Sequence, residues 1–223
     1  FAAIAGSIKG NSSAKAAAEI AVWDLYAQQC GLPLYKLLGG GKTSIVTDLT
    51  ISVNEPDVME RDAAYAVAQG YDTLKIKVGE SPELDIARLR AVRRAAPDAV
   101  VRLDANQAWT PRQAVRILVQ MQSEGLDIEL VEQPVKAHDI DGLRFVTANS
   151  PVPVMADESV FSPSDAFAIM QRHAADYINI KLMKCGGLSN ALKIVSAAEV
   201  YGVECMLGCM LEAKVSVTAA VHL

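Results

Sequence analysis

Residues 73–104 read TLKIKVGESPELDIARLRAVRRAAPDAVVRLD, a short apolar strand pattern, then a helical pattern, then a second apolar strand pattern. The strand patterns at 73–78 and 100–104 are apolar runs rather than clean alternations, which is typical of a parallel sheet covered by helices. Pro82 follows Ser81, the usual order of a helix N-cap and a first helical residue. The stretch therefore predicts one βαβ unit.

The same alternation continues along the chain. Strand patterns recur about 25 to 30 residues apart, the length of a βα unit. Before them, 12–29 predicts a helix that begins at Asn11 and stops at 31–33. The predicted strands are 45–53, 73–78, 100–104, 128–132, 154–156, 177–181 and 204–207, and helices are predicted from Pro56, Pro82 and Pro111. Seven βα units predict an α/β fold, either a (β/α)₈-type barrel or a doubly wound open sheet.

Charged residues at the ends of the predicted strands decide between these two folds. In a barrel the carboxyl ends of all strands ring one mouth, so ionisable groups far apart in sequence converge on one site. In an open sheet they would lie along a line, and the outer ones could not meet. The residues at these ends are Lys75, Lys77, Asp104, Glu132, Asp157 and Lys181. The pattern favours the barrel.

Three of these residues are carboxylates on consecutive strands: Asp104, Glu132 and Asp157. Neighbouring acids at a barrel mouth repel one another unless a cation lies between them. Oxygen-only ligation indicates Mg²⁺, with Mn²⁺ as the alternative, since no histidine lies near these positions. Taken alone, each acid could instead be a strand-end residue that caps the following helix.

The lysines predict acid–base chemistry. Lys75 and Lys77 are two residues apart on one strand, so they point to the same side. Nearby cations and partial desolvation lower a lysine pKa toward the range of a general base. Lys181 ends the strand expected across the barrel, and bases on opposite faces of one carbon are what a racemase or epimerase needs. A solvated surface lysine is the alternative for Lys75.

Composition limits the other classes of function. The chain of 223 residues is 51% hydrophobic and 21% charged with a net charge of −5, which disfavours a nucleic-acid partner. No apolar run reaches the roughly 18 residues of a membrane span. The four cysteines form no CxxC pair, and Cys205 and Cys209 are expected to be buried thiols on an apolar strand. These features predict a cytoplasmic enzyme in a reducing compartment.

Five short strings carry a resemblance to a known family. They are Lys75-Ile76-Lys77, Asp104-Ala105-Asn106-Gln107, Glu132-Gln133-Pro134, Ala156-Asp157-Glu158-Ser159 and the run 179–187, NIKLMKCGG. Together they resemble the enolase superfamily, in the muconate-lactonizing subgroup, and most of all its dipeptide epimerases, which act on L-Ala-D/L-Glu. The resemblance spans nearly the whole chain, and it implies a modified (β/α)₇β barrel behind an N-terminal capping domain.

The resemblance implies a role for each residue. Asp104, Glu132 and Asp157 would hold Mg²⁺, which would bind the substrate carboxylate. Lys77 and Lys181 would be the two acid/base groups, while Lys75 would neutralise the developing enediolate and depress the pKa of Lys77. The residues expected to orient these groups or to touch substrate are Asn106, Glu158 and Thr50, although Thr50 is equally well read as a β-branched strand residue.

The choice among family members rests on the segment after the last predicted strand. Residues 208–212, GCMLE, resemble the dipeptide epimerases at this point, with a Met/Cys packing cluster as the alternative. The mandelate-racemase subgroup would place a histidine base there, and His138, His173 and His222 are instead predicted in helices or loops. Muconate cycloisomerase, o-succinylbenzoate synthase and N-acylamino-acid racemase remain alternatives, as does a non-catalytic barrel with a binding or structural role.

The ends of the chain depart from the family pattern. Residues 1–44 are predicted to be a remnant of the capping domain and its linker, and 45–223 a barrel without its last strand. The chain starts at Phe1 and stops at Leu223, so we expect the functional polypeptide to be longer. Assembly into a homo-oligomer is expected from the resemblance alone.

Overall fold

The computed structural model of the chain describes residues 1–41 and 44–223; Lys42 and Thr43, within the predicted linker, lie outside the described residues. Two compact units are present, and each is described by itself. The central unit comprises Val46–Ser159 and Arg172–Asp176, and the terminal unit comprises Phe1–Ile45, Val160–Gln171 and Tyr177–Leu223. The predicted domain division between residues 44 and 45 stays a prediction.

The central unit contains five parallel strands that pair in chain order. The ladder between the second and third strands runs from Thr73 opposite Val100 to Lys77 opposite Asp104, so both strands end at the same level. The strands are β1 (Leu49–Ile51), β2 (Thr73–Lys77), β3 (Val100–Asp104), β4 (Ile128–Glu132) and β5 (Val154–Ala156). This order places the charged strand ends at one edge of the sheet.

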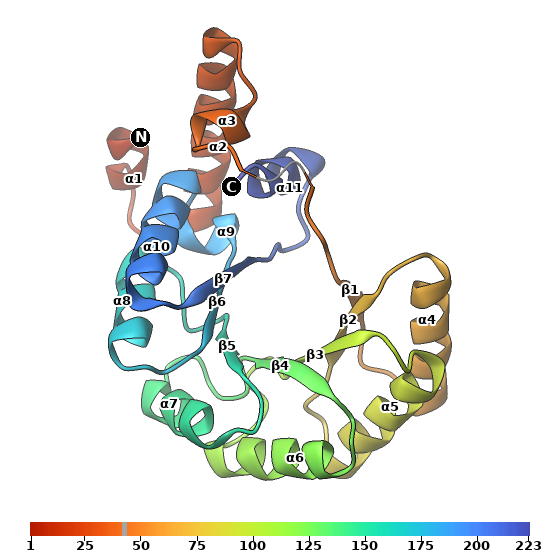
Figure 1. Cartoon of the computed structure of the whole chain (residues 1–223). Coiled ribbons are helices and arrows are strands. Elements are labelled where there is room, and N and C mark those ends of the chain that lie inside the picture. The colour runs from red at the N-terminus through yellow and green to blue at the C-terminus, as the bar shows by residue number, and fades with distance from the viewer. Residues whose placement is uncertain (42–43) are drawn as a thin grey trace. The chain divides into compact units, whose positions relative to one another are not determined.

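Helices connect these strands and cover one face of them (Figure 1). Helix α4 packs on α5, and α6 packs on α7. The helices are α4 (Pro56–Ala68), α5 (Pro82–Ala95), α6 (Pro111–Ser123) and α7 (Ile140–Asn149). Each of the first three begins at the proline that the sequence predicted.

Local hydrogen bonds explain why two of these helices start where they do. The Ser81 hydroxyl accepts from the Leu84 N–H at 3.2 Å, directly before Pro82. Thr110 and Gln113 form a capping box at the start of α6, in which each side chain bonds the other residue's backbone N–H. Such caps satisfy N–H groups that the first helical turn leaves without partners.

The core of the central unit lies between the strands and these helices. Leu74 and Ile76 of β2 and Leu103 of β3 are fully buried, as are Leu89 of α5 and Leu118 of α6. Burying a side chain of this size stabilises the folded state by about 1.5–3 kcal/mol. The apolar residues of the βαβ stretch therefore bury themselves against the helices, while its two lysines are left near the strand end.

The terminal unit contains two parallel strands and seven helices within its described residues. Its strands are β6 (Tyr177–Ile180) and β7 (Glu204–Leu207). Its helices are α1 (Ala2–Gly6), α2 (Ser12–Cys30), α3 (Leu34–Leu37), α8 (Pro163–Gln171), α9 (Leu182–Cys185), α10 (Leu188–Tyr201) and α11 (Lys214–Val221). Helix α2 packs on α9, and α8 packs on α10 (Figure 1).

A buried carboxylate joins α2 to the start of α10. Glu19 is 3% exposed, and its Oε1 accepts from the Ser189 N–H at 2.6 Å and from Trp23 Nε1 at 3.3 Å. A carboxylate is favoured at a helix N-terminus because free N–H groups and the helix dipole meet there. A Cβ atom on Gly187 would lie 2.6 Å from Glu19 Oε2, so this contact requires a glycine before α10.

Three features of the structure differ in detail from what the sequence predicted. Asn11 precedes α2 but has φ of 53°, and its side chain donates to the Lys9 carbonyl instead of capping the helix. Strand β1 is shorter than the predicted 45–53, because only Leu49–Ile51 find ladder partners on β2. The short helix α3 was not predicted. Across the described residues, we find no helix with both the length and the apolar character that crossing a bilayer demands.

Neighbouring residues of α6 test this core. Leu118→Ala removes a fully buried side chain and should lower the free energy of unfolding by about 2–5 kcal/mol. Val119→Ala, at a side chain that is 49% exposed, should change it by less than about 0.5 kcal/mol. Urea denaturation measures both. Equal losses in the two variants would contradict the assigned orientation of the helix.

Candidate active site

The ends of β2, β3 and β4 bring four of the predicted residues into contact. Lys77 Nζ lies 2.6 Å from Asp104 Oδ2. Lys75 Nζ lies 2.9 Å from the same oxygen and 2.7 Å from Glu132 Oε2. The two lysines therefore share one carboxylate, as expected for residues on the same side of a strand. Because the Lys75 side chain is only 12% exposed, its interpretation as a solvated surface lysine is wrong.

The turn after β3 extends this cluster. Asn106 Oδ1 accepts from Lys77 Nζ at 2.5 Å, and Asn106 Nδ2 donates to Glu158 Oε1 at 3.1 Å. The Asn106 N–H donates to Asp104 Oδ1 at 3.0 Å. Asn106 and Gln107 have φ of 42° and 68°, a left-handed backbone that is uncommon outside glycine and is often found at functional sites. The turn thus directs Asn106 to both Asp104 and Lys77.

The three predicted metal ligands are almost completely buried. Asp104, Glu132 and Asp157 are each 1% exposed. Burial and the charges of Asp104 and Asp157 together raise the pKa of Glu132 to about 7, although Lys75 opposes the shift. For Lys75, burial alone would lower the pKa, but the charges of Glu132 and Asp104 outweigh it and hold the pKa above its usual value. The negative charge of the three carboxylates therefore exceeds the positive charge that Lys75 and Lys77 supply.

The donor set fits a hard divalent cation. All three side chains offer carboxylate oxygens, which Mg²⁺ and Mn²⁺ prefer, and the raised pKa of Glu132 shows that additional positive charge is favourable here. Among the residues that the structure describes, no group of three His, Cys, Asp or Glu side chains is arranged to hold a metal ion as it stands. In this structure the ammonium groups of Lys75 and Lys77 lie against Asp104 and Glu132.

Gln133 is a residue of this site that the sequence reasoning did not single out. Its side chain is fully buried, and its Oε1 accepts from the Asp157 N–H at 2.9 Å and the Ser159 N–H at 3.1 Å. Its Nε2 donates to Ser159 Oγ at 2.8 Å and the Val135 carbonyl at 3.0 Å. Gln133 thus fixes the turn that carries Asp157. The available signal was an amide side chain directly after Glu132, at the end of a buried strand.

The predicted roles of two further site residues, Lys181 and Thr50, are not tested by their contacts in the structure. Lys181 follows β6 in the terminal unit and is 9% exposed, and its carbonyl accepts from the N–H groups of Lys184 and Cys185. Its partnership with Lys77, which lies in the central unit, stays a prediction. Thr50 is exposed on β1 and is the ladder partner of Lys75, so its place at the substrate also stays a prediction.

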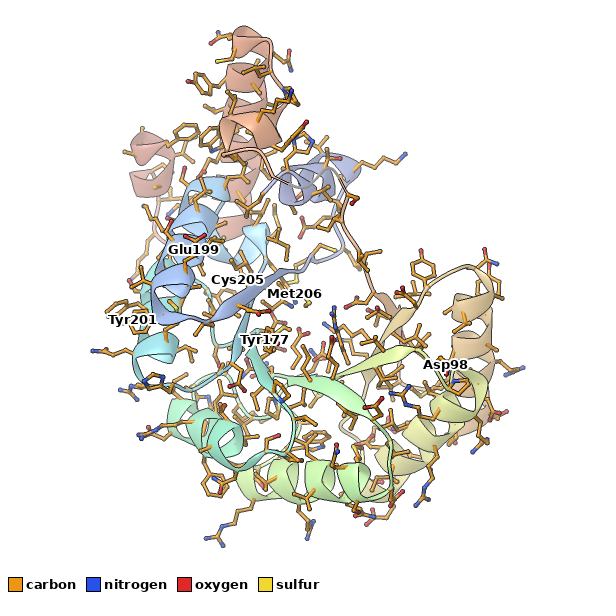
Figure 2. The ribbon with its side chains drawn as sticks, in the orientation of Figure 1. Asp98, Tyr177, Glu199, Tyr201, Cys205 and Met206 are labelled. Atoms are coloured by element: carbon orange, nitrogen blue, oxygen red, sulfur yellow. The ribbon has the colours of Figure 1, made fainter. Side chains whose placement is uncertain are left out.

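The cysteine prediction is wrong in one respect. Cys205 and Cys209 are exposed residues, not buried ones. Cys205 lies on β7, whose ladder partner among the described residues is β6 alone, next to α10 with its Glu199 and Tyr201 (Figure 2). Partial burial of the thiol, together with the charge of Glu199, raises the pKa of Cys205 to about 11. A raised pKa disfavours the thiolate form, which is the nucleophilic one.

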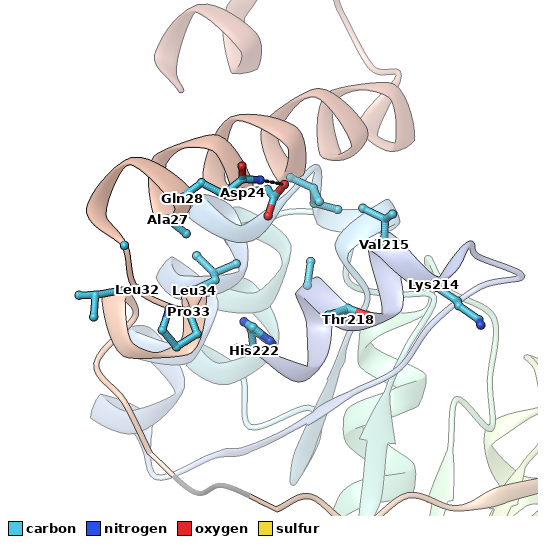
Figure 3. A pocket seen from close by; sticks show the side chains of 13 residues that line it. Asp24, Ala27, Gln28, Leu32, Pro33, Leu34, Lys214, Val215, Thr218 and His222 are labelled. Atoms are coloured by element: carbon cyan, nitrogen blue, oxygen red, sulfur yellow. Dashed lines mark hydrogen bonds between the residues drawn. The ribbon is translucent and has the colours of Figure 1, made fainter.

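The terminal unit also contains a cavity of about 520 Å³ between α2, α3 and α11 (Figure 3). Asp24, Lys214 and His222 lie on its wall, and Asp24 accepts from Gln28 at 2.8 Å. His222 Nδ1 accepts from the Tyr35 N–H at 3.2 Å. None of the predicted site residues lines this cavity.

The raised pKa of Glu132 predicts a pH-dependent stability in metal-free buffer. Because the folded-state pKa (about 7) lies above the ordinary value of 4.5, the folded state binds the proton more tightly. This contribution is fully present below pH 4.5 and is lost as pH rises through 7. Relative to Glu132→Gln, the wild type should therefore lose up to about 3 kcal/mol of unfolding free energy over this range in urea titrations.

Glu129→Gln is the matched control for that experiment. Glu129 lies on the same strand, but its side chain is 43% exposed. Relative to Glu129→Gln, the wild type should show no comparable loss of unfolding free energy as pH rises through 7, because Glu129 lies outside the buried carboxylate cluster. The same pH dependence in both comparisons would contradict the crowding of charge around Glu132.

Comparison with known proteins agrees with this fold. Residues 58–223 match the enolase C-terminal domain-like family, and residues 2–39 match the N-terminal domain of mandelate racemase / muconate lactonizing enzyme. The L-Ala-D/L-Glu epimerase of Clostridium acetobutylicum is 63% identical over 97% of this chain and 61% of that protein. The chain thus spans about three-fifths of the length of the curated relatives it matches.

Two solved structures are similar to the chain throughout its length. The substrate-liganded L-Ala-D/L-Glu epimerase from Bacillus subtilis superposes with a TM-score of 0.97 at 52% identity, covering 98% of this chain and 62% of that one. The dipeptide epimerase from Enterococcus faecalis V583, complexed with Mg and L-Leu-L-Tyr, gives 0.94 at 49% identity, covering 97% and 61%. The α/β fold class predicted from the sequence is confirmed, and the chain belongs to the mandelate racemase and muconate lactonizing enzyme family, with its enolase C-terminal domain-like fold.

Proposed function

We propose that the protein is a Mg²⁺-dependent epimerase that inverts the α-carbon next to a carboxylate, with an L-Ala-D/L-Glu-type dipeptide as substrate. The observation that carries this proposal is the buried cluster in which Lys75 and Lys77 contact Asp104 and Glu132. Relatives named L-Ala-D/L-Glu epimerase are 63% and 53% identical to the chain, which supports this substrate class over the other racemases and cycloisomerases of the family.

The reaction requires both a base and a store of positive charge. An α-proton beside a carboxylate is very weakly acidic, because its removal creates a second negative charge on the substrate. Asp104, Glu132 and Asp157 would hold Mg²⁺, which when bound would supply Lewis-acid stabilisation of that charge. Lys75 adds a fixed positive charge, since its neighbours hold its pKa above the usual value. Stabilising the enediolate is the larger part of the task.

Proton transfer is assigned to two lysines. Lys77 removes or returns the α-proton on one face, and Lys181 does so on the other. Lys77 Nζ donates to Asp104 Oδ2 and Asn106 Oδ1, and it must give up at least one of these bonds to reach a substrate carbon. A cation held by Asp104 would compete with Lys77 for this carboxylate, so cation binding would favour release of Lys77 from it. Asn106 and Glu158 then hold Lys77 in line.

Assembly and location belong to the same proposal. We place the protein in the cytoplasm as a homo-oligomer that acts on a small-molecule substrate. The four cysteines are free thiols, as expected in a reducing compartment. Thr50, the ladder partner of Lys75, is assigned a substrate contact because β1 places it beside the lysine pair.

Exchange of the α-proton tests the catalytic assignment. In deuterated buffer with Mg²⁺, L-Ala-L-Glu should gain an α-deuteron and give both epimers, observed by NMR and mass spectrometry. Lys77→Ala and Lys181→Ala should each lower the inversion rate by about 10²- to 10⁴-fold, because each removes an acid/base group. Lys193→Ala, at an exposed lysine of α10, should have no effect. If no dipeptide shows exchange of its α-proton, the proposed substrate class is refuted.

Metal binding tests the carboxylates separately from turnover. Titration calorimetry should show Mg²⁺ binding that Asp104→Asn abolishes. Gln133→Ala should weaken it by about 10- to 100-fold, because Gln133 fixes the turn bearing Asp157. Gln120→Ala, at an exposed glutamine of α6, is the control. Unchanged affinity in Gln133→Ala would contradict its positioning role, and no binding by the wild type would refute the metal site.

A further inference from the structure

Gly208 directly follows β7 and lies beside the residue after β6, Lys181. Ile180 is the ladder partner of Leu207, and the Gly208 N–H donates to the Ile180 carbonyl at 2.9 Å, which continues the ladder by one step. Side chains two residues apart on a strand point to the same face, so Asn179 and Lys181 share a face. Gly208 adjoins that pair.

Only a residue without a side chain fits at this position. A Cβ atom on Gly208 would lie 2.5 Å from Asn179 Oδ1, 2.9 Å from Asn179 Nδ2 and 3.0 Å from Lys181 Cε. The backbone gives no other reason for a glycine, because Gly208 has no left-handed φ, unlike Gly202 with φ of 68° in the same unit. The requirement at Gly208 is therefore space, and that space is occupied by the stem of Lys181 and the amide of Asn179.

The backbone of these neighbours is fixed, so an added methyl group cannot be absorbed by moving it. The Lys181 carbonyl accepts from the Lys184 N–H at 2.9 Å and the Cys185 N–H at 3.0 Å. The buried Lys184 ammonium donates to the Asn179 carbonyl at 3.3 Å. Asn179 itself is fully buried. The atoms nearest to an added methyl group are therefore those of the Asn179 amide and Cε of the Lys181 side chain.

We propose that Gly208 is a positioning residue, which leaves open the path along which the Lys181 side chain extends and so sets where its ammonium group meets the substrate. This inference rests on the proposed function of Lys181 as one of two bases. A lysine carries its charge at the end of a flexible four-carbon stem, so a wall beside the stem determines the place of the charge. Misplacing a reacting group by about 1 Å can cost about 100-fold in rate.

Two opposed bases provide a readout that a general loss of structure would not imitate. Each epimer presents its α-proton to one lysine only. The C–H bond breaks as that lysine takes the proton, and the electron pair remains on the substrate as the enediolate. The three protons of a lysine ammonium group exchange with solvent deuterium. The same lysine can therefore return a deuteron to the face from which it took the proton, without help from the other lysine. Damage to Lys181 therefore affects exchange from one epimer far more than from the other.

The experiment compares α-deuteron uptake into L-Ala-L-Glu and L-Ala-D-Glu in separate reactions. The purified proteins are wild type, Gly208→Ala, Lys181→Ala as the reference for a lost base, and Gly6→Ala as the control. A Cβ on Gly6 meets nothing within 4 Å, and Gly6 has no left-handed φ. Gly208→Ala should lose about 100-fold of the exchange from the epimer that Lys181→Ala also loses, and less than about 3-fold from the other. Gly6→Ala should match wild type with both epimers.

The outcomes separate this inference from the proposed function. If Gly208→Ala loses exchange equally with both epimers, or with neither, the positioning role is overturned. The proposed function still stands in that case, provided that the wild type catalyses exchange. Absence of exchange in wild type overturns both. If Gly208→Ala does not fold, the double variant Asn179→Ala/Gly208→Ala removes the amide responsible for the two shortest contacts and leaves the Lys181 contact. The difference between its exchange losses with the two epimers, compared with that of Asn179→Ala alone, then decides whether Gly208 positions Lys181.

Discussion

Repulsion among three buried carboxylates is the constraint on which the site depends. Asp104, Glu132 and Asp157 have lost nearly all contact with water, and an ionised carboxylate without a partner is very costly in such surroundings. Lys75 bridges two of the three, and Lys77 contacts one of them. The pKa of Glu132 at about 7 nevertheless shows that compensation is incomplete. The cluster therefore carries more negative charge than its lysines neutralise, which is the property that the proposed cation site requires.

A second buried ion pair in the same unit shows the difference. Asp85 pairs with Arg88 at 3.2 Å and also accepts from the Gly79 N–H at 2.9 Å. Burial raises the pKa of Asp85, whereas every neighbouring group that acts on it lowers the pKa. At Glu132 two neighbouring carboxylates act in the same direction as burial. Like charges gathered in a buried place, rather than burial itself, separate a functional cluster from a structural one.

The sequence predicted those features that depend on local chemistry. Strands β3 and β4 end in Asp104 and Glu132, where an apolar run meets a charge, and their bounds were predicted without error. Helix starts at Pro82 and Pro111 followed from proline after a capping residue. Strand β1 was overestimated because Ile45 and Val46 are apolar, although they are 62% and 79% exposed and have no ladder partner on β2. Apolar character predicts where a strand can form, and the available partner decides where it does.

Residues whose contribution exists only in three dimensions escaped prediction. Gln133 acts through three hydrogen bonds that reach the turn after β5, and a single amide letter shows none of them. Gly208 contributes by having no side chain beside Lys181, which only the neighbouring strand reveals. The charged residues were predictable because a barrel mouth gathers strand ends regardless of detail. What holds such charges in productive geometry is packing and hydrogen bonding between adjacent strands, so the positioning residues are found only after the strands have been placed side by side.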